Sequence, residues 1–311
     1  MIKQMKYILI LSVLFVPLFG FSQNDTILAI DTTFENIVVN KWQTDLYLGN
    51  YQQAIRSAKA ELEDPNIKPY LLDLFPNYYC QAICFARLTE KDSALTYLNR
   101  ALSQRNDFRF YLDSNFKKLL TTDQLDSIKT YFTNMMEPSL SDFDFEYSAT
   151  LAYLSANDEY YRNLIDIYID DEAEQYSLLT KQWHLDSINI FAIDELVKNR
   201  GLPTYKSVGK DGIDAFFIIV LHSNLKHQVK YIKHIKKLSK KGSLSKQNLA
   251  LLTDRILVKQ GKKQIYGTQL YFDEQEMKNK LYPIRSPKNV DKRRTNAGFN
   301  ETISEYLKCF N

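Results

Sequence analysis

The clearest alternation of apolar and polar positions lies between residues 225 and 240. Apolar residues recur there at helical spacing, at Leu225, Val229, Ile232, Ile235 and Leu238. Lysines occupy many of the positions between them, and Gly242 follows as a stop signal. The pattern predicts an amphipathic helix with one apolar face and one lysine-rich face.

Helical pairs are predicted in the N-terminal half of the chain. The apolar spacing indicates helices over residues 34–49, 51–64, 76–88 and 92–104. A further segment over residues 107–136 contains a short turn and then a helix that Thr122 caps. We expect this segment to cap the two pairs, because two repeats alone are fewer than a free-standing array needs.

The middle of the chain is also predicted to be helical. Helices are expected over residues 145–155, 158–179 and 183–199. After a loop, residues 213–221 form a nearly continuous apolar run that ends at His222. Asp211 and Gly212 precede this run and favour a buried helix over a buried strand.

The stretch from Asn248 to Phe272 combines a helix, a stop at Gly261 and a predicted strand. In the strand, Gln264, Tyr266 and Thr268 alternate with Ile265, Gly267 and Gln269. After a turn at residues 273–276, residues 281–284 are predicted to pair back as a short hairpin. A final helical segment follows Pro287.

The first residues are typical of a secretory signal peptide. Lys3 and Lys6 precede an apolar run over residues 7–21, and Ser22 follows. The run is too short to span a bilayer comfortably, so we expect cleavage near Ser22 and export to the periplasm or the extracellular space. No other stretch is long and apolar enough to cross a bilayer, and no transmembrane segment is expected in the mature chain.

The formal net charge of +3 hides an asymmetry along the chain. Residues 23–224 carry 18 Lys and Arg against 30 Asp and Glu, whereas residues 225–311 carry 20 against 7. This split indicates either two halves that attract each other or a basic face for an anionic partner; a solvated lysine face is the alternative. An exported protein with its lysines gathered largely on one helix does not suggest nucleic acid as a partner.

Few residues carry recognisable chemistry. Cys80, Cys84 and Cys309 are too few for an exported domain held by disulfides, so all three are expected to be small core residues with free thiols. Metalloprotease, paired-cysteine, phosphate-loop and serine-elbow motifs do not occur, and we expect no cofactor. The carboxylates of Asp166, Asp170 and Glu174 share a helix face, but such runs are more often solvated than metal-bound, so no metal is expected.

The helical pairs resemble tetratricopeptide repeats. The first pair matches at Leu46, Leu48, Gly49, Asn50, Tyr51, Ala54 and Ile55, and the second at Tyr79, Ala82, Phe85, Ala86, Asp92, Ala94, Leu95, Leu98, Ala101 and Leu102. The resemblance implies a surface that binds a protein or peptide. The predicted fold class is therefore mainly α, with tetratricopeptide-like hairpins followed by a helical domain that carries a small β-hairpin. The expected divisions are a signal peptide over residues 1–22, the repeats with their cap over 23–138, and a C-terminal domain over 139–311.

The C-terminal half resembles a bacterial domain of unknown function. The matching pieces are Asp158-Glu159 with Arg162, Asp186 with Asn189, Gly201-Leu202-Pro203, Val208-Gly209, His222-Ser223-Asn224 with Gln228, Asp254-Arg255, Gln264 with Tyr266-Gly267-Thr268-Gln269, and Asp291 with Arg293-Arg294 before Gly298. Members usually carry Asp-Gln at the first piece and His-Ala-Asp at the fifth, so an acidic residue is missing at Asn224. The resemblance identifies candidate site residues and implies no reaction.

The candidate site gathers polar side chains from segments that otherwise form the core. His222 is the candidate catalytic residue, as a general base that is neutral near physiological pH; alternatively it caps the helix end through one hydrogen bond. The candidate ligand-binding residues are Asp254, Arg255, Gln264, Tyr266, Thr268, Gln269, Arg293 and Arg294. Because an unpaired buried amide or charge is costly, we expect His222 to converge on one concavity with one residue of each of three pairs: Asp254 or Arg255, Gln264 or Gln269, and Arg293 or Arg294. For the arginines, the alternative is an internal network that ties the last helices to the hairpin.

Two hypotheses about function remain open at this point. In the first, the protein is an exported binding or scaffolding module whose repeats hold a protein or peptide and whose C-terminal domain recognises a polar or small anionic group. In the second, it is a hydrolase- or transferase-type enzyme with His222 as base. An open cleft would indicate a site, whereas a sealed network would indicate a structural clamp.

Overall fold

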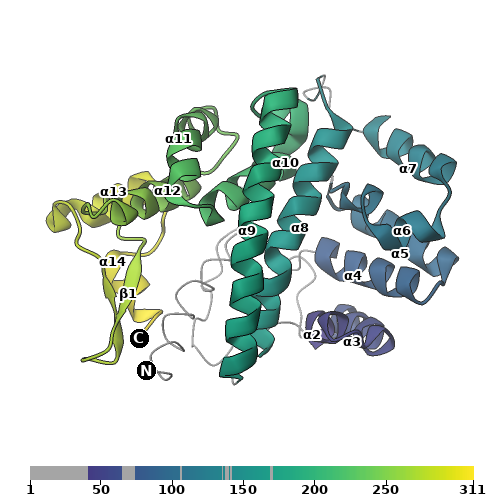
Figure 1. Ribbon diagram of the computed structural model, residues 1–311, viewed down its shortest axis with the longest axis horizontal. Helices are drawn as coiled ribbons and strands as arrows, with labels where there is room; N and C mark the ends of the chain where they lie inside the picture. Colours follow the sequence, from purple (N-terminus) through teal and green to yellow (C-terminus); the bar gives the residue numbers. More distant parts are fainter. Residues whose placement is uncertain are drawn as a thin grey trace. The chain divides into compact units, whose positions relative to one another are not determined.

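The computed structural model describes residues 41–64, 74–105, 107–134, 136, 140, 142–168 and 171–311. Within this part the protein is mainly α-helical, with one two-stranded antiparallel sheet (Figure 1). The predicted class, mainly α with a small β-hairpin, is therefore confirmed. The predicted signal peptide over residues 1–22 and the predicted domain boundary at residue 138 lie outside the described residues.

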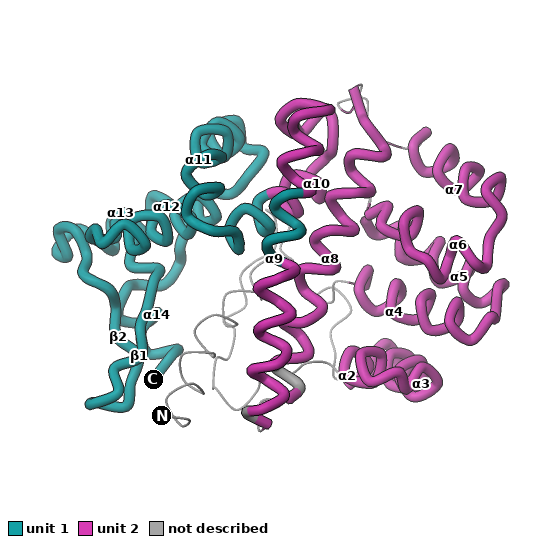
Figure 2. The backbone as a smooth tube through the Cα atoms, in the orientation of Figure 1, with its two compact units in different colours: residues 1–37, 186–191, 217–311 teal, residues 38–185, 192–216 magenta. Residues whose placement is uncertain are grey.

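The chain divides into two compact units, which Figure 2 colours separately. Of the described residues, unit 1 contains Asp186–Phe191 and Phe217–Asn311, and unit 2 contains those within Val38–Leu185 together with Ala192–Phe216. Two long helices therefore contribute residues to both units. No helix in the described part of the chain has the length and apolar character needed to cross a membrane.

Unit 2 begins with two helical pairs. Helices α2 (Lys41–Tyr47) and α3 (Tyr51–Glu63) form the first pair, and α4 (Leu74–Arg87) and α5 (Lys91–Leu102) form the second. Alanines allow the helices to approach closely, since Ala54, Ala58, Ala82, Ala94 and Ala101 are all fully buried. Cys80 and Cys84 are buried free thiols on α4, as predicted, whereas Cys309 is a free thiol that is only partly buried and does not belong to the core.

An aromatic core lies behind these pairs. It is supplied by η2 (Arg109–Tyr111), α6 (Ser114–Leu119) and α7 (Thr122–Asn134). Phe108, Phe110 and Phe116 are fully buried there, with ring centroids about 6.5 Å apart from one to the next. The cap of α7 is Thr121 and not Thr122, because the hydroxyl of Thr121 accepts the Gln124 N–H at 3.3 Å.

Three long helices follow, and their boundaries differ from the prediction. Helix α8 (Phe145–Ile167) runs without a break through residue 156, and α9 (Glu172–Arg200) begins after Asp171, which accepts the Glu174 N–H at 3.0 Å. Helix α10 (Tyr205–His222) carries the predicted apolar run. The side chain of Asp166 and the whole of Asp170 lie outside the described part, so the predicted absence of a metal on that face stays a prediction.

Unit 1 is built on α11 (Leu225–Lys240) and α12 (Lys246–Lys259), which pack against each other. Asn224 caps α11 and Ser245 caps α12, each by accepting a backbone N–H. The buried face of α11 carries Tyr231, Ile235 and Leu238, but the predicted core residue Val229 is 45% exposed. The buried face of α11 is thus rotated slightly about the helix axis relative to the predicted apolar stripe.

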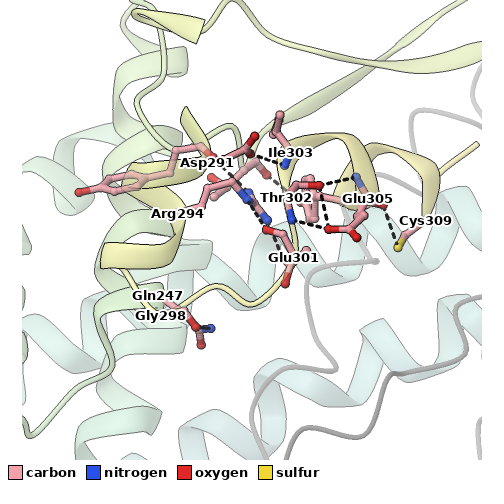
Figure 3. A network of polar contacts seen from close by, with 12 residues as sticks. Gln247, Asp291, Arg294, Gly298, Glu301, Thr302, Ile303, Glu305 and Cys309 are labelled. Carbon is pink, nitrogen blue, oxygen red and sulfur yellow. Dashed lines mark hydrogen bonds and ion pairs between the residues drawn. The ribbon is translucent and has the colours of Figure 1, made fainter. Parts of the chain in front are cut away.

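The rest of unit 1 is short and irregular. The hairpin consists of β1 (Leu270–Asp273) and β2 (Lys278–Leu281), with Leu270 opposite Leu281. After η4 (Pro287–Asn289) come α13 (Val290–Asn296) and α14 (Ile303–Lys308). Thr302 and Glu305 form a capping box at the start of α14, which fixes this short helix (Figure 3).

Candidate functional site

The segment from Gln264 to Gln269 is not a strand. It forms an irregular loop around the carboxylate of Asp254, a fully buried residue in the middle of α12. The carboxylate accepts the N–H groups of Ile265 (2.6 Å), Tyr266 (3.0 Å) and Thr268 (3.1 Å), and also the Thr268 hydroxyl (3.1 Å). A strand would point alternate N–H groups to opposite sides, whereas one carboxylate gathers three of them here. The strand prediction failed because this buried charge dictates the backbone.

Gln264 closes the base of the same loop. Its side-chain oxygen accepts the Gln269 N–H at 2.9 Å, and its Nε2 donates to the carbonyl oxygens of Gln269 (2.9 Å) and Tyr282 (2.8 Å). Gln269 in turn donates from its own Nε2 to the Thr268 hydroxyl at 3.1 Å. The side-chain amide of Gln264 therefore makes hydrogen bonds to backbone groups, as a neighbouring strand would, and joins the loop to the residue that follows the hairpin.

Two adjacent arginines on α13 hold the carbonyl side of the loop. Arg293 donates from Nε to the Ile265 oxygen at 2.8 Å and from Nη2 to the Arg285 oxygen at 2.6 Å. Arg294 donates from Nη1 to the Tyr266 oxygen at 3.1 Å. Neighbours on a helix point about 100° apart, and here the loop passes between the two directions, so both reach it.

Arg294 is fully buried and is neutralised locally. Its Nη2 pairs with the Glu301 carboxylate and its Nε donates to the Glu301 backbone oxygen at 3.1 Å (Figure 3). The guanidinium also stacks over the rings of Phe299 and Tyr306, 4.5 and 4.8 Å from their centroids. Arg294 is therefore a structural cross-link in this unit, in agreement with the alternative of an internal network.

Asp254, Gln264, Thr268 and Arg294 are each at most 1% exposed. We call them, with Arg293, the clamp of the 264–269 loop. Burial raises the pKa of Asp254, and the donors that bind its carboxylate oppose this rise. Because the hydrogen-bonding groups of the clamp are engaged by the protein itself, most of the candidate ligand-binding residues serve to shape the loop.

A second group of polar side chains meets the C-terminal end of α10. Arg255 donates from Nη1 to the Leu221 oxygen at 2.9 Å, and Lys259 donates from Nζ to the Ser223 oxygen at 3.3 Å. The Nε2 of Gln228 donates to both of these oxygens, at 2.8 and 2.9 Å. Carbonyl groups at a helix C-terminus lack intrahelical partners and carry the negative end of the helix dipole, so this group caps α10.

His222 lies between the two capped residues and is partly buried. The predicted site residues thus separate into two groups, because Arg255 turns to α10 while Asp254 turns to the loop. Lys259 was not predicted to belong to any site. Partial burial and then Arg255 lower the pKa of its ammonium to about 8, and Asp186 opposes this shift. Asn224 is the N-cap of α11, where its side chain accepts the His227 N–H, and Asp fills such a position equally well.

An open concavity of about 400 Å³ lies next to the clamp. It is lined by Lys236, Ser239, Lys240, Lys246, Leu249, Tyr266, Arg293, Asn296 and Ala297, and we call it the basic concavity. Four of these nine described residues carry a positive charge and none carries a carboxylate. Of the predicted ligand-binding residues, only Tyr266 and Arg293 line it.

Three lysines of the basic concavity were missed in the sequence. Lys236 and Lys240 lie one turn apart on α11, and Lys246 opens α12 after a short turn. The sequence placed these lysines on two consecutive helices, but it did not show that the two helices pack so that the three side chains line one hollow. Arg293 is held in place by the backbone oxygens of Ile265, Arg285 and Ser286, so its charge is positioned without a paired carboxylate in the described structure.

A family model described as "Family of unknown function (DUF6624)" matches residues 148–311. The match includes the clamp, the capped end of α10 and the basic concavity. Comparisons with curated proteins and with solved structures return no match. The predicted resemblance of the C-terminal half to a domain of unknown function is therefore confirmed, while the comparisons add no relative of known activity.

Proposed function

The chain belongs to the family of unknown function DUF6624, and we propose that it is an exported binding or scaffolding protein whose C-terminal unit holds an anionic group. The basic concavity carries this proposal. Four cations face one hollow whose volume is in the range of ordinary ligand sites, and burying an anion there would lower their mutual repulsion.

The chemistry of the lining supports an oxyanion. Lysine ammonium groups act as mobile point charges for carboxylate or phosphate, and the side-chain amide of Asn296 adds an uncharged donor to the lining. Arg293 adds a charge whose position is fixed by three backbone oxygens. The clamp contributes indirectly, because it holds both Arg293 and Tyr266 in the lining.

The helical pairs of unit 2 support the binding role in a second way. Their spacing resembles tetratricopeptide repeats, which present surfaces to proteins and peptides. On this surface the Arg100 guanidinium lies 5.0 Å from the ring centroid of Tyr97 and 6.0 Å from that of Tyr78. Aromatic and arginine side chains of this kind are enriched at protein interfaces. The signal-like residues 1–22 support export.

The alternative of an enzyme with His222 as general base gains no comparable support. His222 does not line the basic concavity, and the polar groups nearest it in the chain's hydrogen-bond network, those of Arg255, Lys259 and Gln228, donate to the backbone oxygens of its neighbours Leu221 and Ser223. The geometry therefore supports binding at the basic concavity better than catalysis at His222.

Calorimetric titration of the purified protein with sodium tripolyphosphate tests the anion site. The salt concentration is kept at about 50 mM, because salt screens the attraction between the lysines and the anion only weakly at this concentration. The double substitution Lys236→Gln/Lys240→Gln should weaken binding about tenfold or more. Lys262→Gln/Lys263→Gln is the matched control, because it removes the same charge from exposed positions outside the concavity. Equal weakening by both pairs, or no binding by the wild-type protein, would reject the anion site.

A further inference from the structure

The exposed face of α11 carries a regular row of lysines. Lys226, Lys230, Lys233, Lys237 and Lys240 are all exposed, and they recur at intervals of four, three, four and three residues. This is the spacing that keeps side chains on one line along a helix beside a second helix. At a rise of about 1.5 Å per residue the row is about 21 Å long. We call it the lysine row.

The lysine row is set apart from the core by the geometry of the helix. Tyr231, Ile235 and Leu238 are buried, and at about 100° per residue the row lies on the opposite side of α11 from them. The helix contains six lysines and no Asp or Glu, so none of its own residues can neutralise the row. Lys240 belongs both to the row and to the basic concavity, which makes the two a continuous surface.

We infer that the lysine row docks an acidic helical segment of a partner protein, with the basic concavity receiving a carboxylate near one end of that segment. The inference rests on the proposed function, because it names the class of anion that the concavity takes. A helix with Glu or Asp at the same alternation of four and three residues places its charges at the same rise as the lysines, so each pair can meet along the whole row.

Other polyanions fit this surface less well. A flat anionic bilayer cannot fill a hollow of about 400 Å³ at the end of the row. Single-stranded nucleic acid binds to proteins through exposed aromatic side chains on which the bases stack. The exposed residues of α11 are lysines and Val229, and none of them is aromatic. Val229 lies beside Lys226, Lys230 and Lys233 on the helix surface and offers an apolar contact to a partner helix.

The test uses labelled synthetic peptides of about 20 residues on an Ala and Gln background, measured by fluorescence anisotropy against the full chain. One peptide carries Glu at alternating four- and three-residue intervals, and its partner has the same composition with Glu on all sides of the helix. The patterned peptide should bind about tenfold more tightly than the scrambled one, and raising the salt to about 0.5 M should abolish binding. Equal binding of the two peptides would overturn the inference.

Substitutions in the protein separate the row from the concavity. Lys226→Gln/Lys230→Gln/Lys233→Gln should weaken the patterned peptide about tenfold and leave tripolyphosphate binding nearly unchanged. The control Lys262→Gln/Lys263→Gln/Lys288→Gln removes the same charge from exposed positions outside both surfaces, and should change peptide binding by less than about twofold. Tripolyphosphate binding without a preference for the patterned peptide would overturn the docking role and leave the proposed anion site standing. Tighter binding of anionic lipid vesicles or of a single-stranded oligonucleotide than of the patterned peptide would also overturn it.

Discussion

Asp254 and Arg294 bind the backbone N–H and the backbone oxygen of the same residue, Tyr266. The Asp254 carboxylate lies 3.0 Å from the Tyr266 nitrogen, and the Arg294 Nη1 lies 3.1 Å from the Tyr266 oxygen. Asp254 lies on α12 and Arg294 lies on α13, so the 264–269 loop connects the two helices through these hydrogen bonds. The negative charge of Asp254 and the positive charge of Arg294 therefore fix the conformation of the loop backbone at Tyr266, which lies between them.

Asp254→Asn should destabilise the protein by about 3 kcal/mol. The substitution keeps the shape of the side chain but replaces an acceptor oxygen with an NH₂ group that faces backbone N–H donors. Buried donors left without an acceptor cost about 1–3 kcal/mol each, and the lost charge weakens the remaining bonds. Urea unfolding followed by circular dichroism measures the change.

Asp291→Asn is the matched control for this experiment. Asp291 also accepts a backbone N–H, that of Ile303 at 2.7 Å, but it is exposed (Figure 3). Its substitution should cost no more than about 1 kcal/mol, because water can replace the lost acceptor. A loss of stability at Asp254 no greater than that at Asp291 would show that the buried carboxylate does not hold the loop.

Arg294→Lys should cost about 2–4 kcal/mol although it preserves the charge. A lysine cannot reach the Tyr266 oxygen, the Glu301 oxygen and the Glu301 carboxylate together, because it lacks the planar fork. It also loses the stacking on Phe299 and Tyr306. Differential scanning calorimetry should show the loss, and near-wild-type stability would mean that charge alone suffices at this position.

Much of the helical framework could be predicted from local patterns. The apolar run ending at His222 and the stops at Gly242 and Gly261 predicted the C-terminal ends of α10, α11 and α12 to within about two residues. The clamp could be predicted only in part. Its residues were recognised because polar side chains interrupted core-forming segments, but the sequence does not show that they bind backbone groups instead of a ligand.

The errors have identifiable physical causes. The 264–269 segment alternates like a strand, yet its N–H groups turn to a carboxylate that lies ten or more residues earlier in the chain. Neighbours on a helix point about 100° apart, so only one of Asp254 and Arg255 was expected to face the site; the sequence did not show that both bind backbone groups, Asp254 in the loop and Arg255 at the end of α10. The basic concavity depends on three helices meeting, which no local pattern encodes.

Gly267→Ala should destabilise the protein by about 2–3 kcal/mol. Gly267 has a φ of +73°, and an added Cβ would lie 2.3 Å from Cδ1 of Ile303 and 3.2 Å from Cδ1 of Ile284. The left-handed backbone costs an alanine about 1–2 kcal/mol, and the overlap adds to it. Gly261 has a similar φ of +70°, but no atom lies within 4 Å of the added Cβ, so Gly261→Ala should cost only the free energy of the left-handed backbone conformation. Equal losses in chemical unfolding would show that the overlap at Gly267 is relieved without cost.

Lys259 should titrate near pH 8, well below the ordinary lysine value of about 10.4. Partial burial disfavours its charged form, Arg255 one turn away repels it, and Asp186 opposes both effects. The ¹³Cε chemical shift of labelled Lys259 measures this pKa directly. Asp186→Asn should lower it further, because the favourable charge is removed, and Arg255→Gln should raise it. A titration at the ordinary lysine value, or no response to Asp186→Asn, would contradict the assignment of its surroundings.

The same shift predicts the sign of a pH effect on stability. Because the folded pKa lies below the unfolded one, unfolding takes up a proton between about pH 8 and about pH 10.4. The contribution of Lys259 is therefore fully present above the unfolded value and is lost as the pH falls through about 8. Lys259→Met removes this titration, so the difference in unfolding free energy between the wild-type protein and this variant should change across that window and stay constant below it. The change should be small, since Lys259 is exposed enough for water to screen its charge. If the difference in unfolding free energy stayed constant across this pH range, or changed with the opposite sign, the Lys259 ammonium would not be partly desolvated at the end of α10.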